Sequence, residues 1–295
     1  MHNVIEAREL SRDFGDFALD AVSLDLPRGT ILGLIGPNGS GKTTTIRMLM
    51  NMLSPDSGSI RIFGMDFGGS EVEIKNRIGY VGEEQYYYSN KRISWTARFV
   101  SRFYDRWDGI AFNGLMREFG LDPKAKTGKL SKGMKVRLSF AIAFSHHPEL
   151  MILDEPTAGL DPVIRREMLD RLLAFRDESG GSVLISSHIT DDIVRIADHV
   201  AFILDGRIVL HAEKDEILSD WKRIHYREGA LDARTAAGLS RLERRPFGST
   251  GITGRYRDLE PALSGGIASG DVRVENVSLD DVLIAFVEGG RGCGE

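Results

Sequence analysis

Short, largely apolar runs alternate with amphipathic stretches along the first part of the chain. Thr30–Ile35, Leu150–Leu153 and Ser182–Ile185 are such runs, and this pattern is typical of strands that are covered on both faces. The stretch Pro162–Arg176, with a helical pattern, separates the last two runs. The order of strand, helix and strand predicts a parallel sheet flanked by helices, and hence an α/β core.

The residues around the first apolar run predict β-rich structure at the N-terminus. Val4–Leu10 and Phe17–Leu26 mix alternation with short apolar runs, so both are expected to be strands. A helix is expected over Lys42–Leu53, because the turn-forming residues Ser54–Gly58 follow it. A further strand is then predicted over Ser59–Phe63.

Apolar residues in Arg92–Phe119 recur at spacings of three and four, which predicts helix. We expect these apolar residues to form the core of a small helical subdomain. The set consists of Phe99, Phe103, Tyr104, Trp107, Phe112, Leu115 and Phe119. After about His211 the chain becomes rich in glycine, serine and arginine. The predicted division is therefore a main domain over residues 1–215 and a small C-terminal accessory region over residues 216–295.

Composition narrows the class of protein. The 295 residues are 42% hydrophobic, enough for one large core with a small appendage, and the net charge of -5 argues against nucleic-acid binding. Cys293 is the only cysteine, which excludes an intramolecular disulfide and favours a reducing cytoplasm. No apolar run approaches the roughly 18 residues of a membrane span, so a partner would have to supply any membrane association.

A glycine-rich loop directly follows the first apolar run. Gly36, Gly39, Gly41, Lys42 and Thr43 have the spacing of the Walker A motif, whose backbone N–H groups cradle phosphates at a helix N-terminus. Lys42 is expected to reach the β- and γ-phosphates of ATP, and Thr43 to ligate Mg²⁺. A glycine-rich turn that binds nothing would not require lysine and threonine at these positions. The other residues expected to bind nucleotide here are Pro37, Asn38, Ser40 and Thr44.

Two adjacent carboxylates end the run that begins at Leu150, as in the Walker B motif. Asp154 is expected to hold Mg²⁺ through water, and Glu155 to polarise the water that attacks the γ-phosphate. A pair of acids that only caps the strand is a common alternative, and the flanking residues argue against it.

Four further segments determine the family that this chain resembles. Leu130-Ser131-Lys132-Gly133-Met134 is similar to the LSGGQ signature of ATP-binding cassette (ABC) proteins. Ala158–Asp161 resembles the D-loop of that family, Ser187-His188 its H-loop, and Phe14 the aromatic residue that stacks on adenine. The resemblance covers about residues 1–215. It implies a P-loop NTPase core of ABC type, with an antiparallel β subdomain and a helical subdomain that carries the signature.

The resemblance also implies a mechanism. Two cassettes face each other head to tail, and Ser131 and Gly133 of one cap the ATP that is held by Walker A of the other. His188 would contact the γ-phosphate. Because this chain has a single Walker A motif, the second cassette would come from another chain, as a homodimer or a heterodimer. Integral membrane permease subunits would carry the substrate, and hydrolysis would let the pair reopen.

The sequence departs from the family pattern at several positions. Glu83 stands where the family has the Q-loop glutamine, so either Glu83 ligates Mg²⁺ or Gln85 substitutes for the glutamine after a shift in register. Lys132 and Met134 replace a glycine and the terminal glutamine of the signature. The tyrosines 86–88 either dock a permease helix or pack half-buried in the cassette.

The function expected from these residues is ATP binding and hydrolysis by a subunit of an ABC transporter of bacterial exporter type. The protein would be peripheral on the inner face of the cell membrane, attached through its permease. An alternative is an ABC ATPase that acts as a regulatory or mechanical switch on a membrane partner without transport. A cassette ATPase associated with nucleic acid is a third class, but the tandem cassettes or basic insertions typical of such proteins are not visible.

Overall fold

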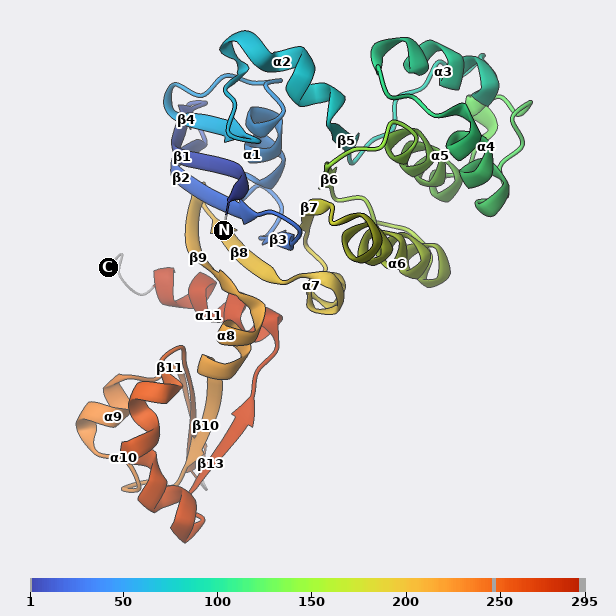
Figure 1. The fold of residues 1–295 in the computed structure, drawn as a ribbon. Coiled ribbons are helices and arrows are strands. Elements are labelled where there is room, and N and C mark those ends of the chain that lie inside the picture. The colour runs from blue at the N-terminus through green and yellow to red at the C-terminus, as the bar shows by residue number, and fades with distance from the viewer. Residues whose placement is uncertain (1, 246–247, 292–295) are drawn as a thin grey trace. The chain divides into compact units, whose positions relative to one another are not determined.

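The computed structural model describes residues 2–245 and 248–291, so Cys293 lies outside the described part of the chain. The chain divides into two compact units, Met1–His211 and Ala212–Glu295 (Figure 1). The division falls four residues before the boundary that was expected after residue 215. Each unit is described by itself below.

A six-stranded sheet forms the centre of the first unit, in the order β5-β6-β7-β3-β8-β9. The four pairings from β5 to β8 are all parallel, and every residue of β3, β6 and β7 is buried. The predicted parallel α/β core is therefore confirmed. The strands are β3 (Ile31–Ile35), β5 (Ile78–Val81), β6 (Leu150–Asp154), β7 (Ser182–Ser187), β8 (His199–Leu204) and β9 (Arg207–Glu213).

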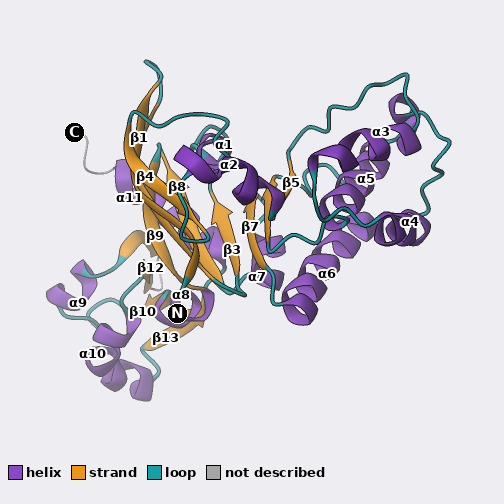
Figure 2. Cartoon of the chain, turned by 45° about the horizontal axis from the view of Figure 1, so that its top comes forward, coloured by secondary structure: helices purple, strands orange, loops and turns teal. Residues whose placement is uncertain are grey.

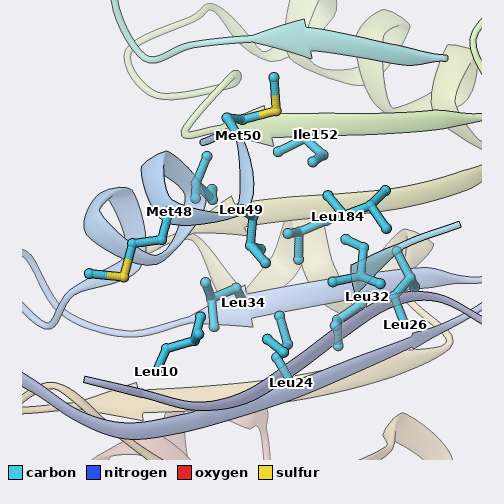
Figure 3. Close-up of a cluster of buried hydrophobic side chains, with 14 of the residues drawn as sticks. Leu10, Leu24, Leu26, Leu32, Leu34, Met48, Leu49, Met50, Ile152 and Leu184 are labelled. Carbon is cyan, nitrogen blue, oxygen red and sulfur yellow. The ribbon is translucent and has the colours of Figure 1, made fainter. Parts of the chain in front are cut away.

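A second, antiparallel sheet of three strands has the order β2-β1-β4. Its strands are β1 (Asn3–Asp13), β2 (Ala18–Pro27) and β4 (Ser57–Ile62). Figure 3 shows how side chains of β1 and β2, such as Leu10 and Leu24, meet Leu34 of β3 and Leu49 of helix α1 in one apolar layer. Burial of this layer joins the two sheets and positions the loop between β3 and α1.

Helix α1 (Lys42–Leu49) ends earlier than the sequence predicted. Asn51 adopts the left-handed conformation with φ 52°, and the N–H of Met52 donates to Arg47 O, so the helical path cannot continue to Leu53. Helix α2 (Phe67–Asn76) was not predicted. Helix α6 (Pro162–Ser179) has Asp161 as N-cap and ends at Gly180 with φ 65°, close to the range that was expected.

The helical subdomain consists of α3 (Ile93–Val100), a 3₁₀ turn (Ser101–Phe103), α4 (Gly109–Glu118), a second 3₁₀ turn (Thr127–Lys129) and α5 (Lys132–Phe144). Figures 1 and 2 show α3, α4 and α5 together beside the edge strand β5. The last helix of the unit is α7 (Thr190–Ile196).

The prediction that all seven apolar residues of this segment form one core is wrong. Phe112, Leu115 and Phe119 are buried, whereas Phe99 is 38% and Phe103 65% exposed. The cause is a break between α3 and α4, where Asp108 begins a new helix by accepting from the N–H groups at positions 110 and 111. The two halves of the pattern therefore do not share one helix face.

The second unit is a small α/β fold around an antiparallel sheet of order β11-β12-β10-β13. Its core contains Ile224, Leu239, Leu263 and Val272. The elements are α8 (Lys214–Asp220), β10 (Lys222–Tyr226), α9 (Ala233–Ala237), β11 (Ser240–Arg245), β12 (Gly248–Thr253), α10 (Tyr256–Ser269), β13 (Val272–Asn276) and α11 (Leu279–Arg291).

Within the described ranges, no helix has both the length and the apolar character needed to cross a membrane.

Candidate nucleotide-binding site

A cleft of about 570 Å³ lies where the parallel strands of the six-stranded sheet end. The carboxyl ends of parallel strands meet at one edge of a sheet, which is where ligands bind in open α/β folds. The loops that follow β3, β5, β6 and β7 each contribute to the cleft. Its lining consists of Phe17, Asn38, Gly39, Gly41, Lys42, Thr43, Thr44, Glu83, Glu155 and His188.

The loop between β3 and α1 requires its glycines for steric reasons. Gly39 and Gly41 have φ values of 81° and 108°, which side chains other than glycine rarely adopt. A Cβ atom on Gly36 would lie 2.3 Å from Ile203 O, and one on Gly41 would lie 2.6 Å from Leu19 Cδ2. The loop therefore packs against its neighbours at distances that only glycine permits.

Lys42 lies at the start of α1 and is buried together with Glu155. Its Nζ donates to Gly36 O at 2.8 Å and to Pro37 O at 3.1 Å, and lies 3.2 Å from Glu155 Oε1. Within the described residues, Glu155 Oε1 has this ion pair but no hydrogen bond. An ammonium group inside the glycine loop can neutralise phosphate charge there.

Glu155 also contacts the end of β7. Its Oε2 lies 2.7 Å from His188 Nδ1 and accepts from the His188 N–H at 3.3 Å. The Glu155 N–H donates to Ser186 Oγ at 2.9 Å. Glu155 has φ 47°, a conformation that costs about 1 to 3 kcal/mol for a non-glycine residue and persists only where neighbouring contacts hold it.

Asp154, Thr43 and Ser186 form a second polar group beside Glu155. Asp154 Oδ1 accepts from Ser186 Oγ at 2.7 Å and from Thr43 Oγ1 at 3.2 Å. A carboxylate and a hydroxyl are hard oxygen donors, which fit Mg²⁺. The described residues contain no group of three or more His, Cys, Asp or Glu side chains arranged to hold a metal.

The two Q-loop alternatives occupy different places. Glu83 lines the cleft together with Lys42, Glu155 and His188. Gln85 Nε2 donates to the backbone oxygens of Gly82 at 2.8 Å and Glu83 at 3.3 Å, so its amide is turned onto its own loop. In this conformation Glu83, and not Gln85, faces the nucleotide cleft.

Phe14 does not line the cleft, whereas Phe17 does. The Phe14 ring is 46% exposed and stacks on Phe17 with 6.2 Å between ring centroids. Arg12 also lies over the Phe14 ring, with its guanidinium carbon 5.3 Å from the ring centroid. Phe17 was missed as a site residue, and its aromatic character three positions after Phe14 was the only signal for it in the sequence.

Ser131 and Gly133 lie at the start of α5 and are not part of the lining of the cleft. Ser131 Oγ accepts from the Met134 N–H at 3.2 Å and caps the helix. Gly133 is buried, and a Cβ atom there would lie 2.6 Å from Ile164 Cδ1. These two residues are therefore not brought to the cleft that Lys42 and Glu155 line.

The three consecutive tyrosines have two different environments. Tyr86 and Tyr88 are 85% and 62% exposed. The Tyr87 hydroxyl lies 2.6 Å from Ser139 Oγ of α5, and burial raises the pKa of Tyr87 to about 12. Tyr87 thus packs inside the helical subdomain while its neighbours face solvent.

Tyr88 belongs to a row of exposed aromatic rings, which we call the aromatic strip and which consists of Tyr88, Trp95, Phe99 and Phe103. Trp95 and Phe99 stack in parallel at 5.3 Å between ring centroids. Tyr88 packs edge-on against both rings, and Phe103 packs edge-on against Phe99. Contiguous exposed apolar surface of this kind commonly marks an interaction site.

Comparison with known proteins agrees with the fold and shows the family of the chain. The ABC transporter family profile matches residues 19–158. The bacitracin transport ATP-binding protein BcrA of Bacillus licheniformis is 37% identical over 212 residues, which cover 71% of this chain and 69% of BcrA. A solved ATP-binding subunit of an ABC transporter is 27% identical with a TM-score of 0.67, over 73% of this chain and 92% of that one. The chain therefore belongs to the ATP-binding proteins of ABC transporters.

A further relative bears on the C-terminal unit. The daunorubicin/doxorubicin resistance ATP-binding protein DrrA of Streptomyces peucetius is 34% identical over 260 residues, which cover 85% of this chain and 76% of DrrA. The first unit ends at residue 211 of 295 and therefore makes up less than 85% of the chain. The alignment with DrrA consequently extends into the second unit.

Proposed function

We propose that this chain is the ATP-hydrolysing subunit of an exporter, which drives transport through separate membrane subunits when two cassettes close on ATP. The observation that carries this proposal is the single cleft that joins Lys42, Thr43, Glu155 and His188. The export direction is supported by the names of two relatives, the bacitracin transport ATP-binding protein BcrA and the daunorubicin/doxorubicin resistance ATP-binding protein DrrA.

The residues of the cleft have distinct roles in this proposal. When ATP binds, Lys42 contacts phosphate and gives up its ion pair with Glu155. The Glu155 carboxylate is then available to accept a hydrogen bond from the attacking water. His188 keeps the Glu155 carboxylate oriented through its 2.7 Å contact and faces the same cleft. Thr43 and Asp154 hold Mg²⁺, which supplies charge neutralisation for the phosphates when bound.

A second cassette completes the site. Ser131 and Gly133 are not in the lining of the cleft, so a cap made of these residues has to come from another copy or a related chain. Ser131 is exposed at a helix N-terminus, which favours a negatively charged phosphate. Phe14 remains the proposed adenine contact, and its ring stacks on Phe17, which lines the cleft.

The aromatic strip is the proposed docking surface for the permease. Its rings offer apolar area that is already exposed, and aromatic residues dominate the binding energy of many interfaces. The chain would then be held on the inner face of the cell membrane by its permease.

The purified full-length chain provides the test of ATP hydrolysis. Lys42→Ala is expected to weaken ATP binding and lower the rate of phosphate release by about 100-fold or more. Lys124→Ala, at an exposed lysine outside the cleft, is the matched control and should retain the wild-type rate. Equal rates in wild type and Lys42→Ala would overturn the assignment of the site.

Transport requires a second measurement, with the chain and its permease reconstituted together in vesicles. ATP-dependent accumulation of a cationic or amphipathic drug that disappears in Lys42→Ala supports export. ATP hydrolysis that responds to the permease without movement of any compound would instead support a regulatory switch.

A further inference from the structure

Asp192 carries a buried carboxylate that the proposed function does not use. It lies on α7 and is only 3% exposed. Its Oδ2 accepts from Thr157 Oγ1 at 2.7 Å, and its Oδ1 accepts from Arg165 Nε at 2.5 Å. Burial of a charge costs free energy unless the charge is paired and hydrogen-bonded, so these contacts offset the cost of burying the Asp192 carboxylate. Because they are charge-assisted, they also hold Thr157 and Arg165 strongly to Asp192.

Asp192 and its partner Thr157 lie close in sequence to two residues that line the nucleotide cleft. Thr157 follows Glu155 by two residues, and Asp192 follows His188 by four. The segment after β6 and the segment after β7 are therefore joined twice, by Glu155 with His188 inside the cleft and by Thr157 with Asp192 behind it. Two side-chain contacts between the same two segments restrict both the distance between the segments and their relative rotation.

The conformation of the segment after β6 makes the hydrogen bond between Thr157 and Asp192 important. Glu155 has φ 47°, and a residue in this region needs support from its surroundings. The backbone turns that follow are short, with the Ala158 N–H donating to Glu155 O and the Leu160 N–H donating to Thr157 O, each at 3.2 Å. Thr157 is the first fully buried side chain that ties this turn to another element through a hydrogen bond.

We infer that Asp192 is a positioning residue that holds Glu155 and His188 in register and so sets the rate of ATP turnover, with little effect on ATP affinity. This inference rests on the proposed ATPase function. Arg165 contributes by holding the second oxygen of Asp192, which leaves the carboxylate one orientation relative to Thr157. Displacement of a reacting group by about 1 Å can reduce a rate by about 100-fold.

The same two helices provide a matched control. Arg195 of α7 forms an ion pair with Asp170 of α6 at 2.5 Å, with side chains 35% and 52% exposed. This pair links α6 and α7 as the pair of Arg165 and Asp192 does, but it lies at the surface, whereas Asp192 is buried. Exposed ion pairs contribute little to stability, so Arg195→Gln separates general helix packing from positioning of the site.

The first experiment compares Asp192→Asn, Thr157→Val and Arg195→Gln in the full chain. We expect kcat to fall about tenfold or more in the first two variants, while the KM for ATP and the Kd of a fluorescent ATP analogue change less than about twofold. Arg195→Gln should match wild type in all three quantities. Wild-type kcat in both Asp192→Asn and Thr157→Val, or an equal fall in Arg195→Gln, would overturn the inference.

The second experiment tests whether Asp192 acts through His188. In a His188→Ala background, adding Asp192→Asn should lower kcat by less than about twofold, because residues that act as a unit are not additive. Fully additive losses would show that Asp192 affects turnover by another route and would contradict the inference.

A third measurement does not depend on turnover. Hydrogen exchange at the amides of Ala158 and Leu160 should accelerate in Asp192→Asn and Thr157→Val, but not in Arg195→Gln. Thr157→Val removes one hydrogen bond without leaving a buried charge unpaired, so it remains informative if Asp192→Asn folds poorly. Unchanged exchange in Thr157→Val would overturn the inference, whereas a wild type without Lys42-dependent hydrolysis would instead overturn the proposed function.

Discussion

The nucleotide cleft and the aromatic strip lie in the same unit but are built in opposite ways. In the cleft, the Lys42 and Glu155 side chains are 6% and 7% exposed, and each charge faces a partner. In the strip, Tyr88 and Phe103 are 62% and 65% exposed, and their contacts are with other rings. Buried charges require fixed partners, whereas stacked rings can stay exposed and available to another molecule. This contrast matches the proposed roles of the cleft in ATP hydrolysis and of the strip in docking.

The two regions also differ in how the chain forms them. The cleft takes its residues from the ends of four strands that are far apart in sequence, whereas the strip comes from the single stretch 88–103. A change in the cleft should therefore affect catalysis without affecting docking, and a change in the strip should do the reverse.

The largest effect is expected from Glu155→Gln, which keeps the size of the side chain and removes its charge. Turnover should fall by about 1,000-fold while ATP still binds, because the amide cannot polarise the attacking water. The variant should also accumulate as an ATP-bound dimer in size-exclusion chromatography and should still bind the permease. Glu178→Gln, at an exposed position outside the cleft, is the control. Wild-type turnover in Glu155→Gln would mean that another group activates the water.

The next effect concerns a buried residue that stacks on Tyr104, the neighbour in sequence of Phe103 of the strip. His146 is 1% exposed and stacks on Tyr104 at 3.9 Å, and burial lowers its pKa from 6.5 to about 4. Between these two pH values the unfolded chain binds a proton that the folded chain does not. The free energy of unfolding should therefore decrease as pH falls from 6.5 to 4, by up to about 3 kcal/mol from this residue.

His146→Phe preserves the ring stack and removes the titration. Urea unfolding at pH 7 and pH 4.5 should show a smaller acid-induced loss of stability in this variant than in wild type. His2→Phe, at an exposed histidine, is the control, and its free energy of unfolding should decrease between pH 7 and pH 4.5 by as much as that of wild type. An identical loss in His146→Phe and wild type would show that His146 does not contribute to the acid sensitivity.

A smaller effect is expected in the strip itself. Phe99→Asp introduces a charge beside Trp95 and should weaken binding of the reconstituted permease by about 10- to 100-fold, as for the loss of an interface anchor. The ATPase rate of the isolated chain should stay within about twofold of wild type. Ile110→Asp on α4 is the matched control, because Ile110 is 84% exposed outside the strip. Equal permease binding in Phe99→Asp and wild type would exclude the strip as the docking surface.

The smallest effect is expected from Glu83→Gln. Removing this carboxylate from the cleft should improve ATP binding when Mg²⁺ is scarce by a few-fold, because like-charge repulsion with phosphate is lost. The Mg²⁺ concentration for half-maximal hydrolysis should stay constant or rise slightly. If Glu83→Gln changes neither quantity and Gln85→Ala impairs turnover, Gln85 is the sensor and the loop rearranges on binding.

Much of the main fold could be predicted from the chain alone, with characteristic errors. The parallel pair β6 and β7 was evident because strands buried on both faces are almost entirely apolar. The end of α1 and the break before α4 were missed, because they depend on the left-handed backbone of Asn51 and on the capping side chain of Asp108, neither of which affects hydrophobic spacing. The break in turn decides that Phe99 and Phe103 are surface residues.

The sequence by itself determined the phosphate loop and the acidic end of β6, because glycine stereochemistry, the adjacent pair Lys42-Thr43 and the adjacent pair Asp154-Glu155 are each local properties of the chain. Only the tertiary structure decided that Glu83 faces the cleft while Gln85 turns away, that Phe17 lines it, and that Asp192 meets Thr157. Apart from the contacts of Gln85 with its own loop, these arrangements bring together segments that are distant in sequence. Their geometry follows from how the strands align in the sheet, which no single segment encodes.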